Sequence, residues 1–404
     1  MAETQTRSWQ LAGHTRALFL NTMALFTVTV LIGILNGLDL VEFSHNQLLT
    51  HVHAGTLGWI TLSVFGASLW LFSENRVLSD GELRRTKTTA MLAAVLITLY
   101  AAAFFVGSTT LRVILGTLTL LAIGAFHGWA MSARKSLEMT IPHLAMLAAL
   151  TSLVIGAILG VLLGLQTAGL DISTRLFAGH PATMVIGYLL LAGMAITEWR
   201  LVPSPEPMSA DKAGVVQVAL LFLGGIILML GILLDVFPLL TLNVPCEVIG
   251  VGIFLVRMRK QLAKAEWSSP GSRRLFAISA LFLIANVVLL AYLIVNYADD
   301  FEAVPSWLLF GLDHSVFIGV MTNALFGLID TWSGGAEAER PWVGNVAFYG
   351  VNAGLIGFVA GLMTQSDLLK HIFAPIMGVS ILVTMAVFAM RLISGGNRPV
   401  EATA

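Results

Sequence analysis

The sequence contains little charge and almost no cysteine. Of its 404 residues, 11% are Asp, Glu, Lys or Arg and 57% are hydrophobic, whereas soluble domains carry about 25% charged residues. Burial of so much apolar surface would need a larger single core than water-soluble domains form. The net charge of −1 gives no basis for a nucleic-acid partner. The single cysteine, Cys246, excludes an internal disulfide and cysteine-rich metal sites. The composition therefore predicts a protein that contacts the lipid bilayer.

Long apolar runs divide the whole chain. A membrane-crossing helix needs about 20 mainly apolar residues, and its backbone groups must bond within the segment. The runs are continuous and not alternating, which excludes a β-barrel. They cover 15–37, 48–73, 87–107, 110–132, 141–166, 176–197, 214–235, 236–257, 272–297, 304–330, 343–363 and 369–393. We predict an all-α polytopic membrane bundle of about twelve transmembrane helices, forming one domain over residues 1–404, whose first helix is a span and not a removable signal.

Basic residues give the expected orientation. With a cytoplasmic N-terminus and alternating spans, all but three of the 22 Lys and Arg residues fall in cytoplasmic segments or the adjoining helix ends. The exceptions are Arg112, Arg175 and Lys370. Because basic residues concentrate on the cytoplasmic side, this bias predicts that both termini are cytoplasmic in a bacterial-type inner membrane.

Histidines concentrate toward the other side. His14, His127 and His143 fall at cytoplasmic ends, whereas the remaining six fall in outer loops or outer halves of spans: His45, His51, His53, His180, His314 and His371. Ionisable residues at membrane depth are costly and usually mark a site. We interpret His45 as solvated and His371 as structural, and take His51, His53, His180 and His314 as candidates.

The candidate histidines recur every four spans. His53, His180 and His314 lie on the second, sixth and tenth spans, and each is followed by a glycine: Gly58, Gly187 and Gly319. This pattern predicts three pseudo-repeats of four helices, at about 15–132, 141–257 and 272–393. The glycines would leave room for a flat macrocycle or for a close helix contact. Thr322 and Asn323, also on the tenth span, are residue types that bond between helices.

The second span reads THVHAGTLGWITLSVFGASLWLF, with His51, Gly58, Trp59 and the pair Phe65–Gly66. It resembles a heme-binding helix of heme-copper oxidase subunit I, most closely the branch of cbb3-type oxidases and nitric oxide reductases. The sequence Gly-His-Pro at 179–181 is similar to the start of that family's sixth helix, where the histidine binds the second metal. The resemblance implies a heme b held by His51 or His53 together with His314, and copper or non-heme iron at His180.

The sequence also departs from that family. The seventh and eighth spans contain no histidine, and Leu312 stands where the tenth helix of the family carries its first histidine. Met184 follows His180 where many oxygen reductases have a tyrosine. The ligand set for a dinuclear centre is therefore incomplete, which leaves enzymatic activity open.

A second family, the NnrS-type heme-copper membrane proteins linked to nitric oxide stress, is also similar. His51, His53 and Gly58 match the spacing of its second helix, although Ala54, Gly55 and Thr56 replace much of that signature. Both resemblances imply a membrane heme protein that handles electrons and a small gas, nitric oxide or oxygen. The electrons would come from a donor subunit, a cytochrome c or quinol. The alternative from another class is a heme-free transporter or channel.

Overall fold

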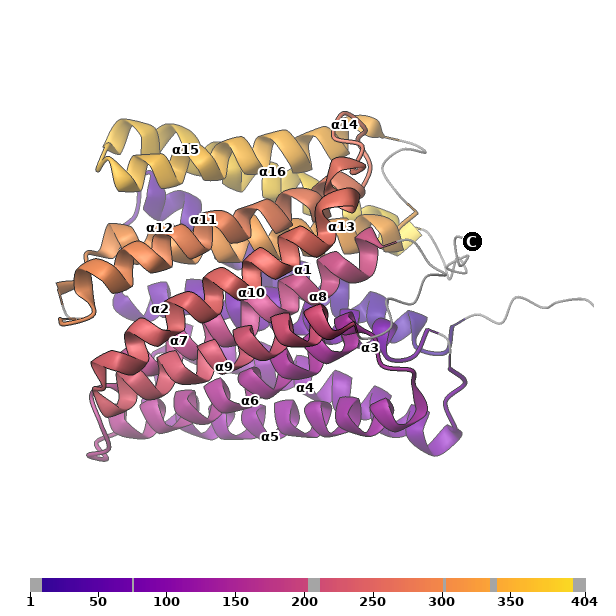
Figure 1. Ribbon diagram of the computed structural model, residues 1–404, viewed down its shortest axis with the longest axis horizontal. Helices are drawn as coiled ribbons and strands as arrows, with labels where there is room; N and C mark the ends of the chain where they lie inside the picture. Colours follow the sequence, from indigo (N-terminus) through magenta and orange to yellow (C-terminus); the bar gives the residue numbers. More distant parts are fainter. Residues whose placement is uncertain (1–8, 75, 203–210, 301–302, 335–339, 395–404) are drawn as a thin grey trace, which may run out of the picture.

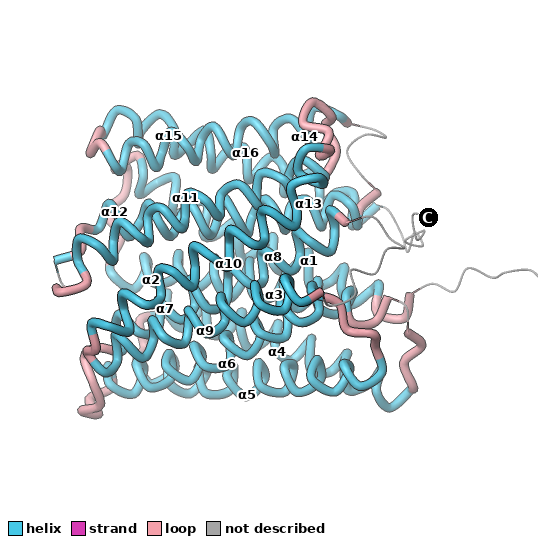
Figure 2. Tube along the Cα trace, in the orientation of Figure 1, coloured by secondary structure: helices cyan, strands magenta, loops and turns pink. Residues whose placement is uncertain are grey.

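The computed structural model describes residues 9–74, 76–202, 211–300, 303–334 and 340–394. Within these ranges the chain forms helices joined by short loops, and no strand occurs (Figure 2). Twelve helical spans of 23 to 28 residues in the described chain are long and apolar enough to cross a membrane. The predicted all-α polytopic bundle is therefore confirmed. Most span ends lie within four residues of those predicted, but the third span begins seven residues earlier, at Asp80, and the eighth ends six residues later, at Ala263.

Nine spans lie at the periphery of the bundle. They are α1 (Ala12–Gly37), α4 (Asp80–Val106), α5 (Thr109–Ala133) with the short 3₁₀ turn η2 (Arg134–Ser136), α6 (Ile141–Thr167), α9 (Lys212–Leu234), α10 (Phe237–Ala263), α11 (Arg273–Tyr297), α14–η6–α15 (Pro341–Asn345, Val346–Gly350 and Val351–Met363) and α16 (Asp367–Ser394). Only 28% to 50% of the residues in their most apolar windows are buried by protein. Leu121 and Val288, for example, are 65% and 61% exposed. These uncovered apolar surfaces face lipid.

The second, sixth and tenth spans lie at the centre (Figure 1). The second span consists of α2 (His45–His53), η1 (Ala54–Thr61) and α3 (Leu62–Leu71). The sixth consists of α7 (Leu176–Ala182), η3 (Thr183–Leu189) and α8 (Leu190–Leu201). The tenth consists of α12 (Ser306–His314), η5 (Ser315–Thr322) and α13 (Asn323–Trp332). Their windows are 89%, 67% and 83% buried. A strongly buried span thus recurs at every fourth position along the chain.

The middle part of each central span is π-helical. These segments, η1, η3 and η5, begin within three residues of the last histidine of their span. The i→i−5 pattern extends to side chains, because Thr61 Oγ1 donates to the Thr56 carbonyl and Thr322 Oγ1 to the Phe317 carbonyl. π-helical turns are rare and occur frequently at functional sites. Three of them in the central spans therefore mark this part of the bundle as a candidate functional site.

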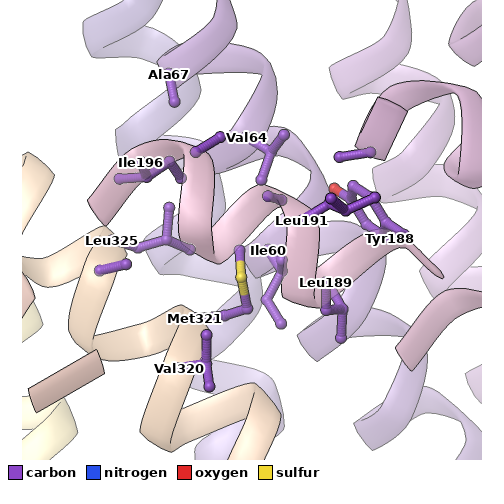
Figure 3. Close-up of a cluster of buried hydrophobic side chains, with 14 of the residues drawn as sticks. Ile60, Val64, Ala67, Tyr188, Leu189, Leu191, Ile196, Val320, Met321 and Leu325 are labelled. Carbon is purple, nitrogen blue, oxygen red and sulfur yellow. The ribbon is translucent and has the colours of Figure 1, made fainter. Parts of the chain in front are cut away.

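The π segments meet one another in the core. The indole Nε1 of Trp59 donates to Thr322 Oγ1 at 3.0 Å, and the Tyr188 hydroxyl donates to Thr61 Oγ1 at 3.2 Å. Around these bonds the three spans bury a dense apolar cluster (Figure 3). Its labelled members come from all three: Ile60 and Val64; Leu189, Leu191 and Ile196; Val320, Met321 and Leu325.

Three tryptophans close the central spans at one end. Trp70 contacts Trp199 and Trp332 edge to face, with ring centroids 5.0 and 4.9 Å apart. Ser394, the last residue of α16, belongs to this same end of the bundle, since the twelve spans alternate in direction. We call it the terminal side, and the opposite end the histidine side. In Figure 1, α2, α7 and α12 lie toward the left, on the histidine side, and α3, α8 and α13 toward the right.

Candidate functional site

The central spans are packed differently on their two sides. All residues of α3 are buried, and so are Asn323–Asp330 of α13. On the histidine side, by contrast, Thr50 is the only buried residue of α2, and Val52 is 42% exposed although its span is central. Protein side chains thus fill the terminal half of the centre and leave the histidine half incompletely covered.

His51 lies between the first and second spans. Its Nδ1 is 2.8 Å from the Thr29 carbonyl oxygen, and Thr29 Oγ1 in turn donates to the His51 carbonyl at 3.2 Å. The imidazole lies flat enough against α1 that a Cβ at Gly33 would be 3.0 Å from its Cε1 atom. Glycine at 33 therefore creates the space that the ring occupies.

His314 lies on the tenth span and faces the second. Its Nδ1 is 2.8 Å from the Phe310 carbonyl oxygen, one turn earlier in α12. The ring contacts Phe358 of α15 edge to face, with centroids 5.0 Å apart. Its imidazole is near enough to that of His51 for the two groups to interact electrostatically. The structure therefore brings together His51, rather than His53, with His314.

His53 and His180 form a second neighbouring pair. The Nδ1 of His53 is 2.8 Å from the Leu49 carbonyl oxygen, and its ring stacks on Phe104 of α4 at 3.8 Å. The Nδ1 of His180 is 2.9 Å from the Gly156 carbonyl oxygen of α6. His51 and His53, which the sequence offered as alternatives, thus each lie near a different histidine.

All four imidazoles share one hydrogen-bonding state. A carbonyl oxygen only accepts, so each Nδ1 must carry the proton and donate it. The neutral ring then presents Nε2 as an unprotonated acceptor. This is how proteins fix the tautomer and orientation of metal-ligating histidines, with the second ring nitrogen bonded to a carbonyl or carboxylate. Each pair is therefore prepared to offer two Nε2 ligands.

No family model matches this chain, and no curated protein matches it.

Sites with three or more metal ligands are absent from the described part of the chain. No group of three or more His, Cys, Asp or Glu side chains there is arranged to hold a metal ion. His180 has an imidazole partner, His53, but no cluster of carboxylates or further histidines. The copper or non-heme iron expected at His180 stays a prediction, and the described residues there offer two imidazoles.

Three of the remaining histidines, His127, His143 and His371, have structural contacts. His143 Nε2 is 3.0 Å from the Leu71 carbonyl oxygen, at the end of α3, and His127 Nε2 is 3.1 Å from Thr151 Oγ1. His371 Nε2 is 2.9 Å from Asp39 Oδ2, and both side chains are well exposed. The structural interpretation of His371 fits this exposed pair.

The glycines after the histidines provide close helix contacts. A Cβ at Gly58 would be 2.8 Å from Leu25 of α1, and one at Gly319 would be 2.5 Å from Phe282 of α11. At Gly187 the distance is 3.3 Å to Ser152 of α6. Of the two roles that the sequence allowed, room for a macrocycle and close helix contact, the structure assigns these glycines the second.

Of the two threonines that link the π segments, Thr61 and Thr322, sequence reasoning missed Thr61. A signal was present: residues 53–66 and 314–327 share His, Gly, Thr, Phe and Gly at identical spacing. Thr322 was singled out for bonding between helices, and this is confirmed by Trp59; Asn323 likewise donates to Asn352 Oδ1 at 2.8 Å. Thr61, the counterpart of Thr322, carries the second link.

Proposed function

We propose that this protein is a membrane-embedded heme b protein that handles electrons, with His51 and His314 as the two axial ligands. The observation that carries the proposal is the shared state of these rings. They are neighbours on two central spans, and each donates its Nδ1 proton to a carbonyl oxygen. Bis-imidazole ligation needs two such Nε2 atoms on facing helices.

The surroundings also fit a heme. The apolar side chain of Val52, beside His51, is left partly uncovered on the histidine side, as a large apolar cofactor requires. The carbonyls of Thr29 and Phe310 hold the two rings in one orientation and raise the basicity of each Nε2. When bound, the cofactor supplies one-electron chemistry between its ferric and ferrous states.

Two axial imidazoles favour electron transfer over gas reduction. Both axial positions are then occupied, so nitric oxide or oxygen would bind only after a ligand leaves or at another centre. The incomplete ligand set for a dinuclear centre points the same way. We therefore infer an electron-carrying role first, with a quinol, a cytochrome c or a partner subunit as donor, and a small gas as a second ligand class.

We also propose an orientation of the bundle in the membrane. The basic residues Arg76, Arg134 and Arg257 lie toward the terminal side, whereas Arg112 and Arg175 lie toward the histidine side. By the positive-inside rule, the terminal side faces the cytoplasm and the histidine pairs lie in the outer half of the membrane. Arg7 and Arg398, which contributed to the same prediction, lie outside the described residues.

The test is heme content in purified variants. His51→Ala and His314→Ala should each remove one low-spin b heme from the reduced-minus-oxidised spectrum, or convert it to a form that binds carbon monoxide. His371→Ala, on the same side but paired with Asp39, is the matched control and should retain the parent spectrum. Unchanged low-spin heme in both ligand variants would reject this pair as the ligands.

A heme-free transporter is the competing function. The exposed central side chains and the break in helical geometry at the π segments would serve a substrate path as well. Absence of heme from protein made in a heme-replete host would favour that function over ours.

A further inference from the structure

His51 and His180 occupy equivalent places in two pseudo-repeats. Each stands seven residues before the glycine of its π segment, Gly58 or Gly187. Each donates Nδ1 to a carbonyl of the span that precedes its own, at 2.8 and 2.9 Å. Each ring also lies against a glycine one turn further along that preceding span. These glycines are Gly33 and Gly160, where an added Cβ would be 3.0 and 2.9 Å from the ring.

His53 and His314 form a second equivalent set. Each stands five residues before its π-segment glycine. Each donates Nδ1 to the carbonyl one turn earlier in its own helix, at 2.8 Å. Each ring contacts a phenylalanine of the span that follows its own, Phe104 for His53 and Phe358 for His314. His180 is therefore the counterpart of His51, and not of His53 as the four-span recurrence had indicated.

Histidines of the two sets pair in the same way at two places in the bundle. In each neighbouring pair, a histidine of the first set lies near enough to one of the second set, on another central span, to interact with it electrostatically: His51 with His314, and His180 with His53. At the third interface the corresponding positions hold Leu312 and Ala182. The bundle thus contains two equivalent sites of two imidazoles each. One lies between the second and tenth spans, and the other lies between the second and sixth.

We propose that His53 and His180 are the axial ligands of a second b heme, so that each chain holds two. This inference rests on the function proposed for His51 and His314, because it assigns the same ligand chemistry to a site with the same construction. In both sites the Nδ1 proton is engaged by a carbonyl and Nε2 remains for a metal.

Arg112 supplies a cation at this second site. It is one of the three basic residues on the histidine side, and it lies near enough to His53 to interact with it electrostatically. Its guanidinium lies over the Phe104 ring, 5.0 Å from the centroid, and bonds Asn46 through Nη2. Its Nε is buried without a hydrogen-bond partner. Heme propionates are anionic, and arginine binds carboxylates through paired N–H groups, so Arg112 is placed to hold a propionate of the second heme.

The experiment measures heme and metal per chain in the full-length protein purified in detergent. The parent should contain about two b hemes, as expected for two bis-imidazole sites. His180→Ala and His314→Ala should each lose one low-spin heme, or convert one to a carbon monoxide-binding form, and the double variant should lose both low-spin species. Arg112→Gln should weaken retention of one heme only. His371→Ala should match the parent, and gel filtration should verify folding of every variant.

The outcomes separate this inference from the function on which it rests. One heme in the parent, lost in His314→Ala and unchanged in His180→Ala, would overturn the second site and leave the first intact. A metal ion lost in His180→Ala while heme stays unchanged would also overturn it. A parent without heme would remove the proposed function itself.

Discussion

Trp59 of the second span donates its indole N–H to the hydroxyl of Thr322 on the tenth, at 3.0 Å. Tyr188 of the sixth span, at the same place relative to its π-segment glycine, donates to Thr61 of the second at 3.2 Å. These two bonds lie directly below the histidine level and join the three central spans. They hold together the helices that carry the two histidine pairs.

We expect the Trp59–Thr322 bond to contribute measurably to stability. A double-mutant cycle of Trp59→Phe and Thr322→Val should give a coupling of about 0.6 kcal/mol, with an upper limit of about 1.7, which is the range for hydrogen bonds between membrane helices. The measurement is unfolding in mixed detergent micelles. Thr117→Val, whose hydroxyl bonds only to Val113 of its own helix, is the control for loss of a threonine. A coupling indistinguishable from zero would mean that this bond does not hold the spans together.

The π-segment glycines should not tolerate alanine. At Gly319 a Cβ would be 2.5 Å from the Phe282 ring, and overpacking of this kind costs about 1–3 kcal/mol. Gly319→Ala should therefore lower the thermal stability seen by fluorescence-detected gel filtration. Gly124→Ala is the matched control, because no atom lies within 4 Å of its Cβ position. Equal stability of the two variants would contradict the close contact between α11 and η5.

A buried ion pair on the terminal side should contribute far more to the free energy of unfolding than an exposed one. Glu198 and Arg257 are joined by two bonds of 2.6 and 2.9 Å, and both side chains are almost fully buried. Glu198→Gln leaves the buried arginine with only the half-exposed Asp211, 3.5 Å away, as a counter-ion, which should cost about 3 kcal/mol.

The exposed pair of Arg175 and Asp235 provides the comparison. Asp235→Asn makes the same chemical change and also suits the left-handed backbone there, with φ of 59°. It should change stability by less than about 1 kcal/mol. Chemical denaturation of both variants in the same detergent measures the difference in free energy of unfolding. If Asp235→Asn loses as much stability as Glu198→Gln, burial does not determine how much an ion pair contributes to stability.

The proposed orientation has its own test. A green fluorescent protein fused after Ala404 should fluoresce in bacterial cells, because it folds in the cytoplasm, whereas alkaline phosphatase at the same place should be inactive. The reverse result would place the terminal side outside the cell and the histidine pairs in the inner half of the membrane.

The fold could be predicted from the sequence because lipid imposes a simple rule. Each run of about 20 apolar residues became a span, and the recurrence of histidine and glycine every four spans fell on the three spans that the structure buries most. The pairing of ligands could not be predicted in the same way. His51 and His53 are two residues apart in sequence but lie near different histidines, and only the packing of the helices decides which one interacts with His314.

The π-helical geometry was also hidden from sequence reasoning. Hydropathy does not distinguish i→i−4 from i→i−5 bonding, so continuous α-helices were expected across the spans. The spacing that Thr61 and Thr322 share, relative to the preceding glycine and the following Phe-Gly pair, carried that information. The shared spacing is evident when residues 53–66 and 314–327 are aligned with each other.

The most direct test of the account is a reduced-minus-oxidised visible spectrum with a pyridine hemochrome assay on the parent protein, purified in detergent from a heme-replete host. We predict a sharp low-spin b-type spectrum that carbon monoxide leaves largely unchanged, since both axial positions are held by histidine. Protein that folds and purifies without any heme would contradict the account.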